Sequence, residues 1–153
     1  MSGTHSVRKD TGAGSDVVVH GRAGGFAQEI TVGSHHLKGD EPVNVGGTDT
    51  GPGPYDFLLA ALGTCTSMTV AMYARRKGWP LEAVTVRLRH SRIHAADCAE
   101  CETREGLLDR IERDIYFDGD LTTEQLLKLQ EIADKCPVHR TLTSEINIRT
   151  RTV

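Results

Sequence analysis

The fold is decided by one stretch, PYDFLLAALGTCTSMTVAMYARRKG, which occupies residues 54–78. Its apolar and small residues recur at steps of three and four, the period of one helical face. They are Leu58, Ala61, Leu62, Cys65, Met68, Thr69 and Met72. The preceding GPGP disfavours helix, and Lys77, Gly78 and Pro80 supply a terminal cation, a C′ glycine and a stop. The stretch therefore predicts a buried helix with Cys65 at its centre.

The thiol of Cys65 has two interpretations. Free cysteine is among the most buried residue types, so Cys65 could be a small hydrophobe that fills core space. The neighbours Gly63, Thr64, Thr66 and Ser67 are small, and they would let another element approach the thiol closely. The rest of the chain must decide between a packing role and a chemical one.

Composition and charge narrow the class of protein. The chain has 153 residues and a net charge of −3, which gives no basic footprint for nucleic acid. The central apolar run is interrupted by Asp56, Thr64 and Thr66, which argues against a membrane span, and no apolar leader precedes it. We therefore expect a cytoplasmic protein. In a reducing compartment four cysteines favour catalytic, redox or metal chemistry over a structural disulfide framework.

The regions before the helix predict a tail and strands. Residues 1–15 lack periodicity and are expected to be a disordered tail, so a single domain should span 16–153. Residues 16–23 and 26–33 are rich in β-formers around Gly24-Gly25 and predict a hairpin, with a third strand at 36–38. Arg22 lies beside this turn, where it could face a site or solvent. Residues 39–53 predict a glycine-rich loop, ordered or mobile, without the ending of a phosphate loop.

The regions after the helix predict two strands, a helix and a final strand. Residues 81–94 alternate with period two until Ile93 breaks the phase, and residues 111–117 predict a second half-exposed strand. Thr122 and Gln125 form a capping signal for a helix that carries Cys136 at its end, before Pro137. Residues 144–153 alternate again and predict a last strand. The order β-β-(β)-α-β-β-α-β indicates an α+β fold, with two helices on a curved, mainly antiparallel sheet.

A Cys-x-x-Cys motif lies in an acidic loop between the two middle strands. His94, Cys98 and Cys101 would supply three of the four ligands of a tetrahedral zinc ion. A single motif of this kind is weak evidence, because no second pair is present to complete the shell. The alternatives left open are a zinc site, a redox-labile thiol pair and an exposed loop without chemistry.

Cys65 and Cys136 suggest a different chemistry when they are taken together. A thiol attacks an oxidant as thiolate, and the resulting sulfenic acid over-oxidises unless a second thiol condenses with it. Both cysteines are predicted on inward-facing helical positions. Packing of the two helices could therefore bring the thiols within bonding distance.

Two motifs of this chain resemble the OsmC/Ohr family of thiol-dependent hydroperoxide reductases. One is GTDTGPGPYDFLLAALGTCTSM at residues 47–68, and the other is ADKCPVHRTL at residues 133–142. The resemblance implies an intertwined α+β homodimer that reduces organic hydroperoxides to alcohols. It also implies that Cys65 is the peroxidatic nucleophile and Cys136 the resolving thiol. No bound cofactor is implied, and the electron donor would be a dithiol such as a reduced lipoylated protein.

The sequence departs from the hydroperoxide-resistance branch at one position. That branch has a glutamate directly after the motif proline, paired with an arginine, whereas this chain has Tyr55 followed by Asp56. Asp56 could take over the carboxylate role, and Arg22 could supply the cation. Two other functions stay open: a non-enzymatic protein that binds an apolar small molecule on the same fold, and a zinc-binding module built on His94, Cys98 and Cys101.

Overall fold

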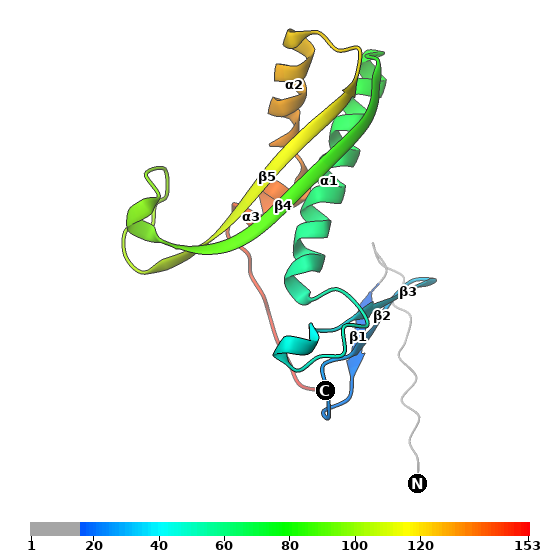
Figure 1. The fold of residues 1–153 in the computed structure, drawn as a ribbon, viewed down its shortest axis with the longest axis vertical. Helices are drawn as coiled ribbons and strands as arrows, with labels where there is room; N and C mark the ends of the chain where they lie inside the picture. The colour runs from blue at the N-terminus through cyan, green and yellow to red at the C-terminus, as the bar shows by residue number, and fades with distance from the viewer. Residues whose placement is uncertain (1–15) are drawn as a thin grey trace. The chain divides into compact units, whose positions relative to one another are not determined.

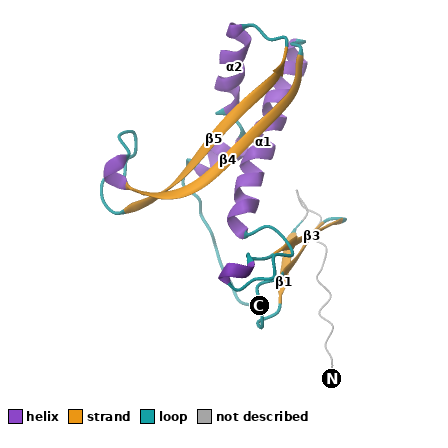
Figure 2. Ribbon diagram, viewed as in Figure 1, coloured by secondary structure: helices purple, strands orange, loops and turns teal. Residues whose placement is uncertain are grey.

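The computed structural model describes residues 16–153, so the tail predicted at 1–15 lies outside the described residues. The chain divides into two compact units, the first ending at Pro54 and the second spanning Tyr55–Val153. Antiparallel strands and helices build these units (Figures 1 and 2), and the predicted α+β class is confirmed. The single domain expected over 16–153 stays a prediction.

The first unit contains a three-stranded antiparallel sheet. Its strands are β1 (Val17–Gly21), β2 (Gln28–Val32) and β3 (His35–Gly39), in the order β1-β2-β3. The predicted hairpin and third strand are thus confirmed. A short 3-10 helix, η1 (Val43–Val45), follows in the glycine-rich loop.

The buried carboxylate of Asp40 organises the glycine-rich loop. It accepts hydrogen bonds from the backbone amides of Glu41 (2.8 Å), Thr48 (3.2 Å) and Thr50 (3.2 Å), and from both threonine hydroxyls. A side chain at Gly47 would place its Cβ 1.8 Å from the carbonyl oxygen of Glu41, so glycine is required there. Of the two alternatives, an ordered or a mobile loop, the structure has the ordered loop, which its own hydrogen bonds hold together.

The second unit starts within the predicted central helix. Helix α1 spans Pro54–Lys77 and ends at Gly78, which has a φ of 69°, and the amide of Trp79 donates to the carbonyl of Ala74 at 2.9 Å. Strands β4 (Leu81–His94) and β5 (Leu107–Gly119) form a long antiparallel hairpin whose loop contains the 3-10 helix η2 (Ala95–Asp97). Helices α2 (Thr123–Ala133) and α3 (Pro137–Leu142) follow.

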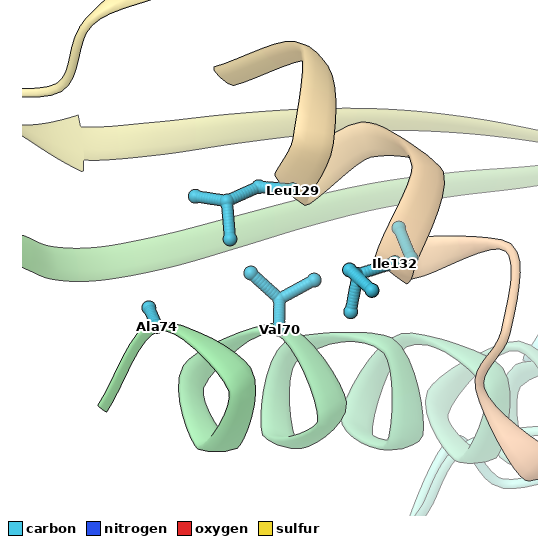
Figure 3. Close-up of a cluster of buried hydrophobic side chains, with 5 residues drawn as sticks. Val70, Ala74, Leu129 and Ile132 are labelled. Atoms are coloured by element: carbon cyan, nitrogen blue, oxygen red, sulfur yellow. The ribbon is translucent and has the colours of Figure 1, made fainter. Parts of the chain in front are cut away.

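A small apolar core joins α1, α2 and the hairpin. Figure 3 shows Val70 and Ala74 of α1 facing Leu129 and Ile132 of α2. Partly buried side chains of β4 and β5 complete the cluster, among them Val84, Ile115 and Phe117. Judged by length and composition alone, α1 is long and apolar enough to cross a membrane. The core helices of other proteins meet the same criterion. Burial of these side chains positions α1 against α2.

The buried face of α1 differs from the predicted one. Leu62, Gly63, Thr66, Val70 and Ala74 are buried, whereas Leu58, Met68 and Met72 are exposed. Gly63 explains the choice of face, because a Cβ there would lie 2.7 Å from the Cδ1 of Leu88 on β4. The small side chains on this face allow β4 to pack close to α1. Apolar periodicity alone could not identify the face, because it does not depend on how closely a neighbour packs.

Two further predictions near the C-terminus were wrong. The second helix ends at Ala133, so Cys136 lies between α2 and α3 and not on the last turn of one helix. Residues 144–153 form no strand in the described chain, and Ile146 and Ile148 are exposed. A strand needs a neighbour to pair with. The remaining strands form two sheets, β1-β2-β3 and β4-β5. The alternation of buried and exposed side chains breaks at Ile93, but Ile93 still pairs with Leu108 in the β4–β5 ladder.

Replacing Leu129 with alanine tests the core. Leu129 is 0% exposed, so Leu129→Ala should lower the free energy of unfolding by about 3 kcal/mol. The control is Leu127→Ala on the same helix, which should change it by less than about 0.5 kcal/mol because Leu127 is 64% exposed. Urea denaturation measures both. Equal changes would contradict the assigned core.

The Asp40 loop predicts a pH dependence. Hydrogen bonds from the Thr48 hydroxyl first, then from the Glu41 amide and the Thr50 hydroxyl, hold the pKa of Asp40 far below its ordinary value of 3.8. Because the folded-state pKa is depressed, this stabilisation is fully present above pH 3.8 and is lost as the pH falls through the folded-state pKa.

Asp40→Asn should therefore lower the hydrogen-exchange protection of the Thr48 and Thr50 amides near neutral pH. The difference from wild type should shrink as the pH falls below 3.8. The control is Asp49→Asn, because Asp49 is exposed in the same loop and asparagine tolerates its φ of 55°. A difference that stays constant with pH would refute the role of the Asp40 charge.

Candidate functional site

Cys65 lies at the centre of α1, at the boundary between the buried and the exposed face. Its thiol is free and partly exposed, whereas the next residue, Thr66, is fully buried. The predicted central position is confirmed. A partly exposed thiol can be reached by a small molecule, which a fully buried one cannot.

Cys136 is the second free thiol, and it is 0% exposed. It is the N-cap of α3, and its Sγ accepts a hydrogen bond from the backbone amide of His139 at 3.3 Å. Its Sγ also lies 3.7 Å from the Oγ1 of Thr66. Adjacent Cα atoms are about 3.8 Å apart. The fold thus brings Cys136 against the residue that directly follows Cys65.

Arg113 of β5 is the residue of this site that the sequence analysis missed. Its Nη1 donates to the Oγ1 of Thr66 at 2.8 Å and to the carbonyl of Ala133 at 3.4 Å, and its Nη2 donates to the Oδ1 of Asp134 at 2.7 Å. The side chain is only 11% exposed. A signal was available, because Arg113 shares the core-facing phase of the strand with Ile111 and Ile115.

The hydroxyl of Thr66 fixes the direction of these hydrogen bonds. It donates its single proton to the carbonyl of Leu62 at 2.7 Å, and it accepts from Arg113. The contact with Cys136 must then be an acceptor contact, in which the S–H group of the cysteine donates to Oγ1. Reduced Cys136 is therefore held as a hydrogen-bonded thiol.

The other candidates lie elsewhere. Arg22 is exposed in the β1–β2 turn and lines a hollow of about 650 Å³ together with His20 and Lys38. Asp56 lies in the first turn of α1, where a carboxylate is favourable for the helix dipole. Arg22 and Asp56 belong to different units. Their pairing beside Cys65 stays a prediction.

Tyr55, at the position of the glutamate in the hydroperoxide-resistance branch, makes a packing contact. Its ring stacks on that of His90 with centroids 4.3 Å apart, and the Nε2 of His90 lies 2.8 Å from the Oδ1 of Asp109. Tyr55 thus attaches the start of α1 to the hairpin.

Cys98 and Cys101 form a disulfide in the loop between β4 and β5. Both sulfurs are bonded to each other, so together with His94 they do not form a metal-binding group in the part of the chain that the structure describes. The zinc alternative would require both thiols to be reduced, and it stays a prediction.

The sequence matches one known protein family over most of its length. The family described as OsmC-like protein matches residues 47–151, which include both free cysteines. The chain belongs to the OsmC-like family. No curated protein matches it significantly.

Solved OsmC-like structures share the fold at low sequence identity. An OsmC-like protein from Mycoplasma pneumoniae is 17% identical with a TM-score of 0.65, covering 85% of this chain and 87% of its own. An organic hydroperoxide resistance protein OsmC from Legionella pneumophila is 20% identical with a TM-score of 0.61, covering 88% and 92%. The organic hydroperoxide resistance protein OhrB of Bacillus subtilis is 18% identical with a TM-score of 0.58, covering 84% and 90%. At these sequence identities the solved structures show that this chain shares their fold.

The role of Arg113 can be tested by removing its donors. Arg113→Met keeps the length of the side chain but leaves Thr66 and Ala133 without their guanidinium partner, and the free energy of unfolding should fall by about 1–3 kcal/mol. Alkylation of Cys136 should become faster, because its hydrogen-bonded surroundings loosen. Chemical denaturation and mass spectrometry of alkylated peptides provide the two measurements.

The matched control is Arg89→Met on the neighbouring strand. Arg89 pairs with Glu112 and Asp114 on an exposed face, so this change should cost less than about 1 kcal/mol and leave Cys136 unaffected. Equal effects of the two substitutions would show that Arg113 acts only as a surface charge.

Proposed function

We propose that this OsmC-like protein is a cysteine-based hydroperoxide reductase that converts organic hydroperoxides to alcohols. The observation that carries the proposal is the position of Cys136, whose sulfur lies 3.7 Å from the hydroxyl of the residue that follows Cys65. The thiol of Cys65 is partly exposed, and the thiol of Cys136 is buried against Thr66, the next residue after Cys65 in the chain. An accessible thiol with a second thiol near its helix turn supports a two-thiol mechanism.

Each thiol has a separate task in this mechanism. The thiolate of Cys65 attacks the outer oxygen of the hydroperoxide, the O–O bond breaks, and the alcohol leaves as Cys65 becomes a sulfenic acid. Cys136 then attacks the sulfenic sulfur, water leaves, and a Cys65–Cys136 disulfide forms. An external dithiol, such as a reduced lipoylated protein, reduces this disulfide and restores both thiols.

The quaternary structure and location belong to the same proposal. Leu58, Met68 and Met72 expose an apolar face of α1, with Met68 67% exposed. Beside it, α1 and β4 border an open groove of about 400 Å³. A second copy of the chain would cover such a surface, which favours the homodimer implied by the family resemblance. A reducing compartment such as the cytoplasm would keep both thiols ready for the next cycle.

Serine substitutions distinguish the two thiols. Cys65→Ser should abolish consumption of cumene hydroperoxide with dihydrolipoamide, because no nucleophile remains. Cys136→Ser should consume about two equivalents and then stop, because the first converts Cys65 to sulfenic acid and the second oxidises it further to sulfinic acid. Peroxide assays and mass spectrometry of Cys65 follow both outcomes.

A normal rate of hydroperoxide consumption by Cys65→Ser would refute the proposed peroxidase activity. A Cys65 thiol inert to peroxide, in a protein that an apolar ligand stabilises, would instead favour a non-enzymatic binding protein.

A further inference from the structure

The Cys98–Cys101 disulfide lies at the end of the β4–β5 hairpin, apart from the two free cysteines. Figure 1 shows the loop that joins β4 and β5 extending away from α1 and α2. Cys98 is 4% exposed, whereas Cys101 is partly exposed. The two sulfurs are therefore unequal, and only that of Cys101 presents accessible surface to an incoming thiol.

The loop of the hairpin is closed by its backbone as well as by this disulfide. The backbone already closes the loop, because the amide of Ala95 donates to the carbonyl of Gly106 at 2.8 Å, directly after the His94–Leu107 strand pair. A disulfide stabilises chiefly by restricting the unfolded chain, and the effect is smallest for short loops. Cys98 and Cys101 are three positions apart. The loop therefore does not require this disulfide in order to close.

We propose that Cys98 and Cys101 form a second redox centre, which exchanges electrons with a protein dithiol. A thiolate of the partner attacks the sulfur of Cys101, the Cys98–Cys101 bond breaks, and Cys98 leaves as a thiolate that takes up a proton. The second thiol of the partner then attacks the mixed disulfide and releases Cys101. The partner ends as a disulfide, and both hairpin cysteines end as thiols, so two electrons and two protons are transferred.

The charge of the loop indicates which dithiol fits. Asp97, Glu100, Glu102 and Glu105 are exposed around the disulfide, and Arg104 is the single cation between Ala95 and Gly106. Such a surface repels anionic thiols such as glutathione and attracts a dithiol with a basic rim. The proposed partner is therefore a protein whose dithiol is bordered by lysine or arginine.

The proposal can be tested in the full chain without the peroxidase thiols. In the Cys65→Ser/Cys136→Ser variant, a dithiol peptide flanked by lysines should reduce the hairpin disulfide about tenfold faster than the same peptide flanked by glutamates. The difference between the two reduction rates should disappear at high salt. Because Cys65 and Cys136 are absent, the result is independent of the proposed peroxidase. Equal rates, or resistance to both peptides, would overturn the proposal.

Two charge variants locate the effect. In the Cys65→Ser/Cys136→Ser background, Glu100→Gln/Glu102→Gln should reduce the difference between the rates at which the two peptides reduce the disulfide. Glu82→Gln/Glu145→Gln, with the same change of net charge away from the loop, should leave it unchanged. If both variants reduced this difference equally, the net charge of the protein and not a built surface would be responsible.

Single cysteines identify the attacked sulfur. With the oxidised lysine-flanked peptide, Cys98→Ser should trap a mixed disulfide on Cys101, whereas Cys101→Ser should trap one on Cys98 about tenfold more slowly. Hydrogen exchange at the Ala95 amide provides the structural control and should stay protected after reduction. Loss of this protection would make the disulfide a structural brace and overturn the proposal.

Discussion

The nearly buried guanidinium of Arg113 constrains how the second unit is assembled. Desolvating a cation is costly unless hydrogen-bond acceptors replace water around it. The acceptors come from three places: the hydroxyl of Thr66 on α1, the last carbonyl of α2, and the carboxylate of Asp134 just beyond it. Satisfying one side chain therefore fixes the C-terminal end of α2 against the middle of α1. The turn that follows carries Cys136 to its place beside Thr66.

The elements of the fold were largely predictable, because their signals are local. Pro54, Gly78 and Thr122 mark helix ends through backbone chemistry that depends on a few neighbouring residues. The strand at 81–94 follows from the alternation of its own side chains. The buried face of α1 was not predictable in this way. It depends on how closely β4 approaches Gly63, and that is a property of two segments together.

The sequence analysis selected Cys65 and Cys136 as candidates, but it did not select Arg113, which contacts Thr66. Cys65 and Cys136 belong to long motifs, so each could be selected before any contact was known. Arg113 lies between Glu112 and Asp114, so it is easily assigned to the exposed face although it shares the phase of Ile111 and Ile115. Its role follows only from a contact across 47 positions of the chain. The phase of the strand indicates the side on which Arg113 lies, but it does not identify the acceptors on α1 and α2.

The surroundings of the two cysteine pairs imply an order of redox potential. Reduced Cys136 donates a hydrogen bond to Thr66 and accepts one from the amide of His139, whereas exposed carboxylates surround the hairpin pair. A pair whose reduced form is stabilised is the stronger oxidant. Electrons exchanged between the pairs would therefore run from the hairpin dithiol toward a disulfide of Cys65 and Cys136. The fold thus gives chemically similar residues different surroundings: Cys136 is hydrogen-bonded to its neighbours, and the hairpin pair lies among negative charges.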